Sequence, residues 1–183
     1  MAYSKKQTVN NKNIPYCLTA AGLFICLKLG YTLADQDDLV FLLKPIDQLV
    51  ELVTDSPSVY LAETGYYHEK LNIVIDKSCS GFNFLILCFL SFIYLIIKYL
   101  NRPLHKITAF PIAFICAYAL TLFVNTSRIL ASIIIQNQTK DLILSRQHLL
   151  HEAIGIITNL SFLVLAYYLI EKLLMQKFHA KPA

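Results

Sequence analysis

The sequence DKSCSGFNF, residues 76–84, marks the point at which a polar loop becomes a long apolar run. Cys79 lies on this boundary, and its neighbours Ser78, Ser80 and Gly81 are small or polar. Such neighbours predict a sulfur atom that other molecules can approach. A cysteine reacts as the thiolate, which needs access and a nearby positive charge. The stretch therefore predicts the start of an apolar helix and, beside it, a candidate nucleophile.

The composition on both sides of this boundary indicates a membrane protein. The chain has 183 residues, of which 56% are hydrophobic, and its mean hydropathy is +0.54. A membrane-spanning helix needs about 20 mainly apolar residues. Four such runs lie at roughly 14–34, 82–99, 107–125 and 152–173. We therefore expect an all-α integral membrane protein with about four transmembrane helices and an extracytoplasmic amphipathic helix and loop segment.

The charged residues predict how these helices are oriented. Lysine and arginine near the ends of spans mark cytoplasmic segments, whereas acidic residues have little influence. Basic residues gather at the N-terminus, between the second and third runs, and in the tail: Lys5, Lys6, Lys12, Lys98, Arg102, Lys106, Lys172, Lys177 and Lys181. We therefore expect both termini and the 100–106 loop in the cytoplasm, and segments 35–81 and 126–151 outside.

The domain organisation that follows is simple. Residues 14–175 are predicted to form a single membrane-embedded domain between cytoplasmic tails at 1–13 and 176–183. The first run resembles the apolar part of a signal peptide, but its length favours an uncleaved anchor. Lys28 interrupts that run near its outer end, where we expect its ammonium group to reach outward to the interface.

Segment 35–75 is too charged to cross a membrane. Its apolar residues recur at a helical period between 39 and 53, interrupted by Pro45, which predicts one or two helices on the outer surface. Residues 60–75 alternate in polarity and contain Gly65, which predicts a hairpin. This segment is a candidate lid over the membrane domain.

The third apolar run continues past the polar residues 125–127 to Ile135. An unbroken helix over that length would measure about 42 Å. We therefore expect a break at 125–127, after which residues 129–135 bend into the interface. Residues 136–147 are expected to form a loop and a short helix.

The predicted topology places three reactive side chains on the outer side of the membrane. Cys79 lies at the outer end of the second run, Arg128 just past the third, and His151 at the start of the fourth. A thiol nucleophile, a guanidinium group that binds an oxyanion and an imidazole base together suit acyl transfer. Gly155 follows His151 by one helical turn and would let a neighbouring helix approach closely.

Three short motifs support this interpretation. Cys-Ser-Gly at 79–81, Asn-x-x-Arg-Ile at 125–129 and His-x-x-x-Gly at 151–155 resemble, in this order, the motifs of the exosortase and archaeosortase family. The resemblance covers about residues 75–175, and the small size is most similar to the exosortase K group. Ser78 stands where the family often has alanine.

The resemblance implies a cysteine peptidase or transpeptidase of the bacterial inner membrane, without a cofactor. Its substrates would be exported proteins with a C-terminal sorting signal: a motif, a transmembrane helix and a basic tail. Cys79 would form the acyl-enzyme, Arg128 would stabilise the oxyanion, and His151 would transfer the proton. The positions expected to bind substrate or to support these three are Ser80, Gly81, Asn83, Asn125, His148 and Gly155. Asn125 would act through hydrogen bonds to Arg128.

Other interpretations stay open. A buried thiol is often inert, an arginine at a span end is often an anchor, and His148 competes with His151 as the base. A non-enzymatic assembly or transport protein would also have four spans. A thiol acyltransferase that acts on lipid would use the same acyl-enzyme chemistry.

Several further classes of protein are disfavoured. A serine hydrolase could use Ser80, Ser127 or Ser132, but none has a supporting motif, and no span holds the paired acids of an aspartyl protease. The absence of CxxC argues against a thiol oxidoreductase. His148 and His151 lack a third metal ligand, because Glu152 would point elsewhere. The basic clusters suit a lipid bilayer, and nothing indicates a nucleic acid partner.

Overall fold

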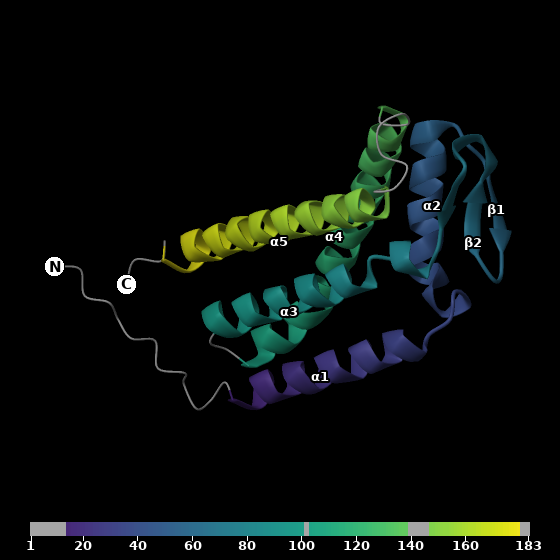
Figure 1. Cartoon of the computed structure of the whole chain (residues 1–183). Coiled ribbons are helices and arrows are strands. Elements are labelled where there is room, and N and C mark those ends of the chain that lie inside the picture. The colour runs from purple at the N-terminus through teal and green to yellow at the C-terminus, as the bar shows by residue number, and fades with distance from the viewer. Residues whose placement is uncertain (1–13, 101–102, 139–146, 180–183) are drawn as a thin grey trace.

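The computed structural model of the chain describes residues 14–100, 103–138 and 147–179. Figure 1 shows the arrangement of the elements. In chain order they are α1 (Ile14–Leu33), η2 (Asp37–Leu39), α2 (Val40–Thr54), β1 (Ser58–Leu61), β2 (Gly65–His68), η3 (Glu69–Leu71), β3 (Ile73–Ile75), η4 (Lys77–Cys79), α3 (Phe82–Tyr99), α4 (Pro103–Gln138) and α5 (Gln147–His179), where η denotes a single 3₁₀ turn.

Within the described residues, four helical segments are long and apolar enough to cross a membrane: Ile14–Leu33, Lys77–Tyr99, Ile107–Ile135 and Ala153–Gln176. The prediction of a mostly helical, four-span protein is therefore confirmed. The α3 helix is central and packs against α1, α4 and α5. Its segment is 61% buried, whereas that of α5 is 6% buried. The outer helices can expose their apolar faces because lipid tails are as apolar as those side chains.

The α4 helix runs without interruption for 36 residues, so the predicted break at 125–127 is wrong. Two of its hydroxyl groups find partners within the helix. The hydroxyl group of Ser127 donates to the carbonyl of Phe123 at 2.8 Å, and that of Thr121 donates to the carbonyl of Ala117 at 2.7 Å. Such bonds to the preceding turn let serine and threonine sit inside a helix.

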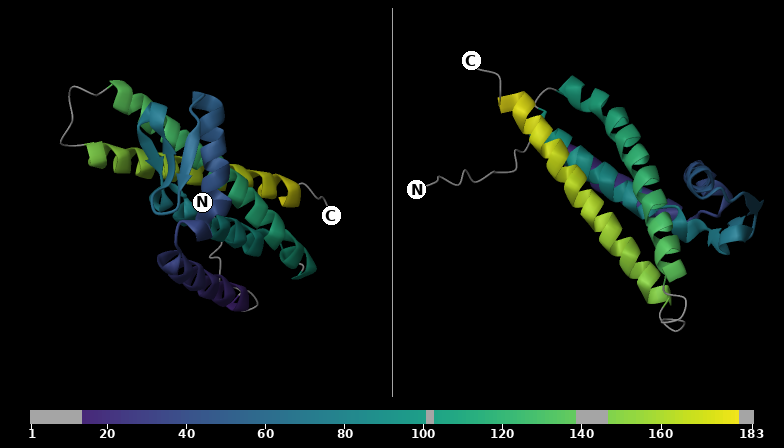
Figure 2. Two further views of the ribbon diagram at one scale, coloured as in Figure 1. Left: turned by 90° about the vertical axis from the view of Figure 1, so that its right-hand side faces the viewer. Right: turned by 90° about the horizontal axis from the view of Figure 1, so that it is seen from above.

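Segment 35–75 forms a separate layer at one end of the helices, as both views of Figure 2 show. The prediction of a surface helix is confirmed by α2, which buries Leu42, Leu43, Ile46 and Val50. The predicted hairpin is an antiparallel sheet of three strands in the order β1-β2-β3. The first residue of β2, Gly65, has φ +102°. A Cβ there would lie 2.4 Å from the carbonyl oxygen of Ile75, so this position requires glycine.

A buried polar network joins α2 to the sheet. His68 is fully buried, and its two ring nitrogens contact Asp47 Oδ1 and the carbonyl of Ser56, each at 2.9 Å. The hydroxyl group of Ser58 donates to Asp47 Oδ2 at 3.0 Å. Burial raises the pKa of Asp47, against the opposing effect of these hydrogen bonds. The network makes α2 and the sheet one packed unit.

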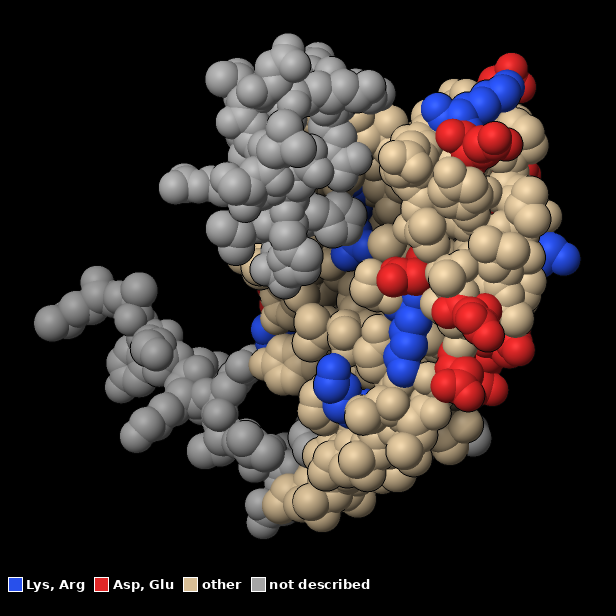
Figure 3. Space-filling view, turned by 45° about the vertical axis from the view of Figure 1, so that its right-hand side comes forward, with Lys and Arg blue, Asp and Glu red and all other residues tan. Residues whose placement is uncertain are grey.

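The charged side chains gather over this unit. Figure 3 shows acidic groups close to basic ones on the side that holds α2 and the sheet, beside a broad uncharged surface. This distribution matches a segment in water next to helices in lipid.

Candidate active site

The cysteine of interest lies in a tight turn built by the sequence before α3. Asp76 Oδ1 accepts hydrogen bonds from the backbone N–H of Ser78 at 2.9 Å, from that of Cys79 at 3.3 Å, and from the Ser78 hydroxyl at 2.6 Å. An aspartate that caps a helical turn satisfies N–H groups that otherwise lack partners. We call residues 76–81 the cysteine turn. Sequence reasoning missed Asp76, although an acid two to three residues before the capped N–H groups is a readable signal.

Gly81 ends the cysteine turn and lets α4 approach it. Its φ is +69°, and a Cβ there would lie 3.1 Å from Asn125 Cγ and 3.1 Å from Thr121 Cγ2. In the space that the missing side chain leaves, Asn125 Nδ2 donates to the carbonyl of Cys79. The expectation that Asn125 would bond to Arg128 is not what the structure shows. Asn125 holds the backbone of the cysteine turn instead.

The sulfur atom of Cys79 is packed inside the protein. The residue is 7% exposed and belongs to the main hydrophobic core. The expectation of an approachable sulfur is therefore wrong. The space that the missing side chain of Gly81 leaves is occupied by α4 rather than by solvent. Asn125, which bonds to the carbonyl of Cys79, lies three residues before Arg128 on α4, so the structure places Arg128 within one helical turn of the contact with the cysteine turn.

The side chain of Arg128, on α4, contacts α5 at Gly155. A Cβ at Gly155 would lie 3.4 Å from Arg128 Cδ and 3.5 Å from its Nη1. The space left by this glycine is thus filled by the arginine side chain, so α4 and α5 meet through it. Among the described residues, no hydrogen-bond partner is found for Arg128 Nε, which is buried. Part of the guanidinium group is therefore free to bind a further acceptor.

The third predicted residue is located only by its backbone. His148 and His151 belong to the first turns of α5, but their side chains lie outside the described part of the structure. His151 precedes Gly155 by four residues, and residues four apart share a face of a helix. The turn that holds His151 is therefore adjacent to the Gly155–Arg128 contact, and the role of the imidazole stays a prediction.

The remaining predicted residues have separate places. Ser80 is buried, and its Oγ accepts from the backbone N–H of Phe82 at 3.4 Å, which supports the start of α3. Asn83 points toward α1, where its Oδ1 accepts from Lys28 Nζ at 2.6 Å. Lys28 was expected simply to reach outward, but it also bridges α1 and α3. No group of three possible metal ligands occurs among the residues whose side chains are described.

Comparison with known proteins adds one finding. A family model described as transmembrane exosortase (Exosortase_EpsH) matches residues 54–168, which is more than half of the chain. The matched region includes the cysteine turn, all of α3 and α4, and α5 as far as residue 168. No curated protein and no solved structure matches the chain.

Proposed function

This chain belongs to the transmembrane exosortase family, whose members are generally peptidases, and on that premise we propose that Cys79 is its catalytic nucleophile. The substrates are exported proteins with a C-terminal sorting signal, made of a motif, a transmembrane helix and a basic tail. The observation on which the proposal rests is that Asn125, three residues before Arg128 on α4, bonds to the carbonyl of Cys79 and so fixes the cysteine turn against the helix that carries the arginine. By size and motifs the chain is most similar to the exosortase K group.

The proposed reaction begins at the carbonyl carbon of the scissile peptide bond. The sulfur of Cys79 bonds to that carbon while the thiol proton passes to His151, and the carbonyl oxygen becomes an oxyanion beside Arg128. The C–N bond then breaks, and His151 returns the proton to the leaving amine. An acceptor amine, a hydroxyl group or water attacks the thioester and releases the thiol.

Arg128 suits the oxyanion role for two reasons. Its side chain is held between α4 and α5 at Gly155, so it is positioned before the substrate arrives. Its Nε donor is buried without a partner, and an unpaired buried donor costs roughly 1–3 kcal/mol. An oxyanion that accepts from this guanidinium group would remove that cost in the transition state.

Near the same site, α4 holds three buried polar atoms that have no hydrogen-bond partner among the described residues: Asn125 Oδ1, Thr126 Oγ1 and Ser132 Oγ. Buried polar groups normally have partners. A substrate main chain offers N–H and C=O groups that can bond to such atoms, so we assign these three to substrate binding.

The burial of the thiol fits an acyl-transfer enzyme. Water that is kept away from a thioester cannot hydrolyse it, which leaves time for another acceptor.

In the proposed orientation both termini are cytoplasmic, and the cysteine turn lies at the outer face of the inner membrane, below α2 and the sheet. The basic residues near the span ends support this orientation.

The test compares exported proteins in a host that lacks the gene and is complemented with wild type, Cys79→Ala or Cys116→Ala. Cys116 is a second free cysteine, exposed on α4, and serves as the control. We expect wild type and Cys116→Ala to remove the C-terminal helix and tail from the same set of proteins, as read by mass spectrometry of C-terminal peptides. Identical processing by a stably expressed Cys79→Ala would favour a non-enzymatic role.

A further inference from the structure

We propose that the groove between α1 and α3 binds one anionic phospholipid, with its phosphate at Lys28 and Lys77 and an acyl chain along α3. The groove has a volume of about 460 Å³ and is lined by eight residues that offer almost only apolar surface, among them Ala21, Leu87 and Ile97. This site is separate from the cysteine, so the proposal does not depend on the peptidase assignment.

The depth of the groove suits an acyl chain. Its lining on α3 runs from Leu87 to Ile97, and ten steps of 1.5 Å make about 15 Å along the helix. Half of a bilayer's hydrocarbon core is about 15 Å thick. An acyl chain of a lipid can therefore lie along the whole apolar lining, with its headgroup at one end.

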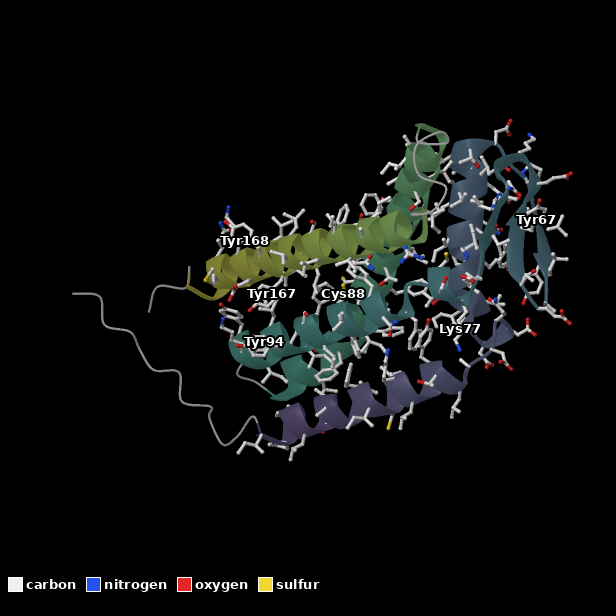
Figure 4. The ribbon with its side chains drawn as sticks, viewed as in Figure 1. Tyr67, Lys77, Cys88, Tyr94, Tyr167 and Tyr168 are labelled. Carbon is white, nitrogen blue, oxygen red and sulfur yellow. The ribbon has the colours of Figure 1, made fainter. Side chains whose placement is uncertain are left out.

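Two cations stand at the outer end of this groove. Lys28 Nζ donates to Asn83 Oδ1, four residues before Leu87, and Lys77 Nζ donates to the carbonyl of Ala34 at 2.5 Å. Both ammonium groups lie over the ring of Tyr31, at 5.6 Å and 5.1 Å from its centroid. In Figure 4, Lys77 lies near the outer end of α1, while Tyr94 of the groove lies at the opposite end of α3.

The charge balance at the two ends fixes the direction of the lipid. At the inner end, Lys98 is paired with Glu171 at 2.6 Å. Within the described residues, neither Lys28 nor Lys77 forms an ion pair with a carboxylate. Three acids of the neighbouring segments have other bonds: Asp38 accepts from the N–H of Asp35, Asp37 from Tyr60, and Asp76 from the cysteine turn. The carboxylate of Asp35 forms no ion pair with either lysine among the described residues. A phosphate group would therefore supply the missing negative charge at the outer end.

The test measures lipids that remain bound to the purified protein. Wild type is reconstituted in bilayers of equal parts palmitoyl-oleoyl phosphatidylglycerol and phosphatidylcholine, then released and analysed by native mass spectrometry. A basic residue near an anionic surface contributes about 1 kcal/mol, so we expect wild type to favour phosphatidylglycerol. Lys28→Gln and Lys77→Gln should each reduce that preference about fivefold.

Control variants separate the headgroup from the groove. Lys70→Gln, whose ammonium group bonds to a backbone carbonyl in the sheet segment, should leave the preference unchanged, and Lys28→Arg should retain it. Ala21→Leu should reduce the retention of both lipids, because it fills the groove. Equal retention of the two lipids by wild type, or an unchanged preference in the Lys28→Gln, Lys77→Gln double variant, would overturn the headgroup assignment. Unchanged retention in Ala21→Leu would overturn the groove assignment.

Discussion

The substitution Gly81→Ala should damage the candidate site through a single methyl group. Gly81 has φ +69°, and a Cβ there would lie 3.1 Å from both Asn125 Cγ and Thr121 Cγ2. These distances are shorter than ordinary contacts between carbon atoms. The added methyl group should therefore push Asn125 away and weaken its hydrogen bond to the carbonyl of Cys79.

The expected cost has two parts. A residue with a Cβ in the left-handed region costs roughly 1–2 kcal/mol relative to the right-handed one. Loss of one intramolecular hydrogen bond costs roughly 0.5–1.5 kcal/mol. Together they predict that the free energy of unfolding of Gly81→Ala falls by about 1.5–3.5 kcal/mol. Since Asn125 also holds the cysteine turn, processing of substrate should fall as well.

The assay is equilibrium unfolding of the purified variants in one detergent, with Gly22→Ala and Gly30→Ala as controls. A Cβ at either control glycine has nothing within 4 Å, so these variants should be as stable as wild type or slightly more stable. In the double variant with Thr121→Ser, which removes Cγ2, part of the stability should return. If Gly81→Ala unfolds like Gly22→Ala, the close approach of α4 to the cysteine turn is wrong.

The remaining predictions address other contacts. Gly155→Leu should displace Arg128 and reduce substrate processing at least tenfold at near-normal expression. Gly155→Ala should be tolerated, since its Cβ would lie 3.4 Å from Arg128 Cδ, and equal activity of both variants would contradict the contact. Burial raises the pKa of Asp47, so its carboxyl group binds a proton more tightly in the folded state than in the unfolded state. Stability should therefore decline as the pH rises above about 4 through the raised pKa. In thermal melts from pH 4 to 7, Asp47→Asn should remove this decline, and an unchanged slope would show another group to be responsible. Asp47→Ala should cost roughly 1–3 kcal/mol in the same melts, because His68 loses a buried partner. Asp76→Ala should cost about 1 kcal/mol, through the lost cap of the cysteine turn, and should also slow processing, and a variant with full activity and stability would show the cap to be dispensable.

The sequence was sufficient for the features that depend on local pattern. Runs of about 20 apolar residues predicted the four spans, and alternation over residues 60–75 predicted a hairpin. The break expected at 125–127 failed for a non-local reason. Asn125 looks like a helix breaker in isolation, but its amide group bonds to a carbonyl 46 residues away.

The candidate site shows the same division. The short motifs indicated Cys79 and Arg128, and the structure shows that the helix of Arg128 bonds through Asn125 to the carbonyl of Cys79; the catalytic roles stay a prediction. The small neighbours of Cys79 suggested access, yet a small residue admits whichever partner is closest, and here that partner is α4. The bond between Lys28 and Asn83 joins residues 55 apart, and no pattern within one helix predicts such a pairing.

The most direct test of the central claim is to intercept the acyl-enzyme with hydroxylamine. Added to cells that express the protein, hydroxylamine attacks a thioester and leaves a hydroxamate at the new C-terminus of each processed substrate. The thioester at Cys79 predicts hydroxamate C-termini with wild type and with Cys116→Ala, and none with Cys79→Ala. Processed substrates that carry only free carboxylates in wild type, or hydroxamates that persist in Cys79→Ala, would contradict nucleophilic catalysis by this cysteine.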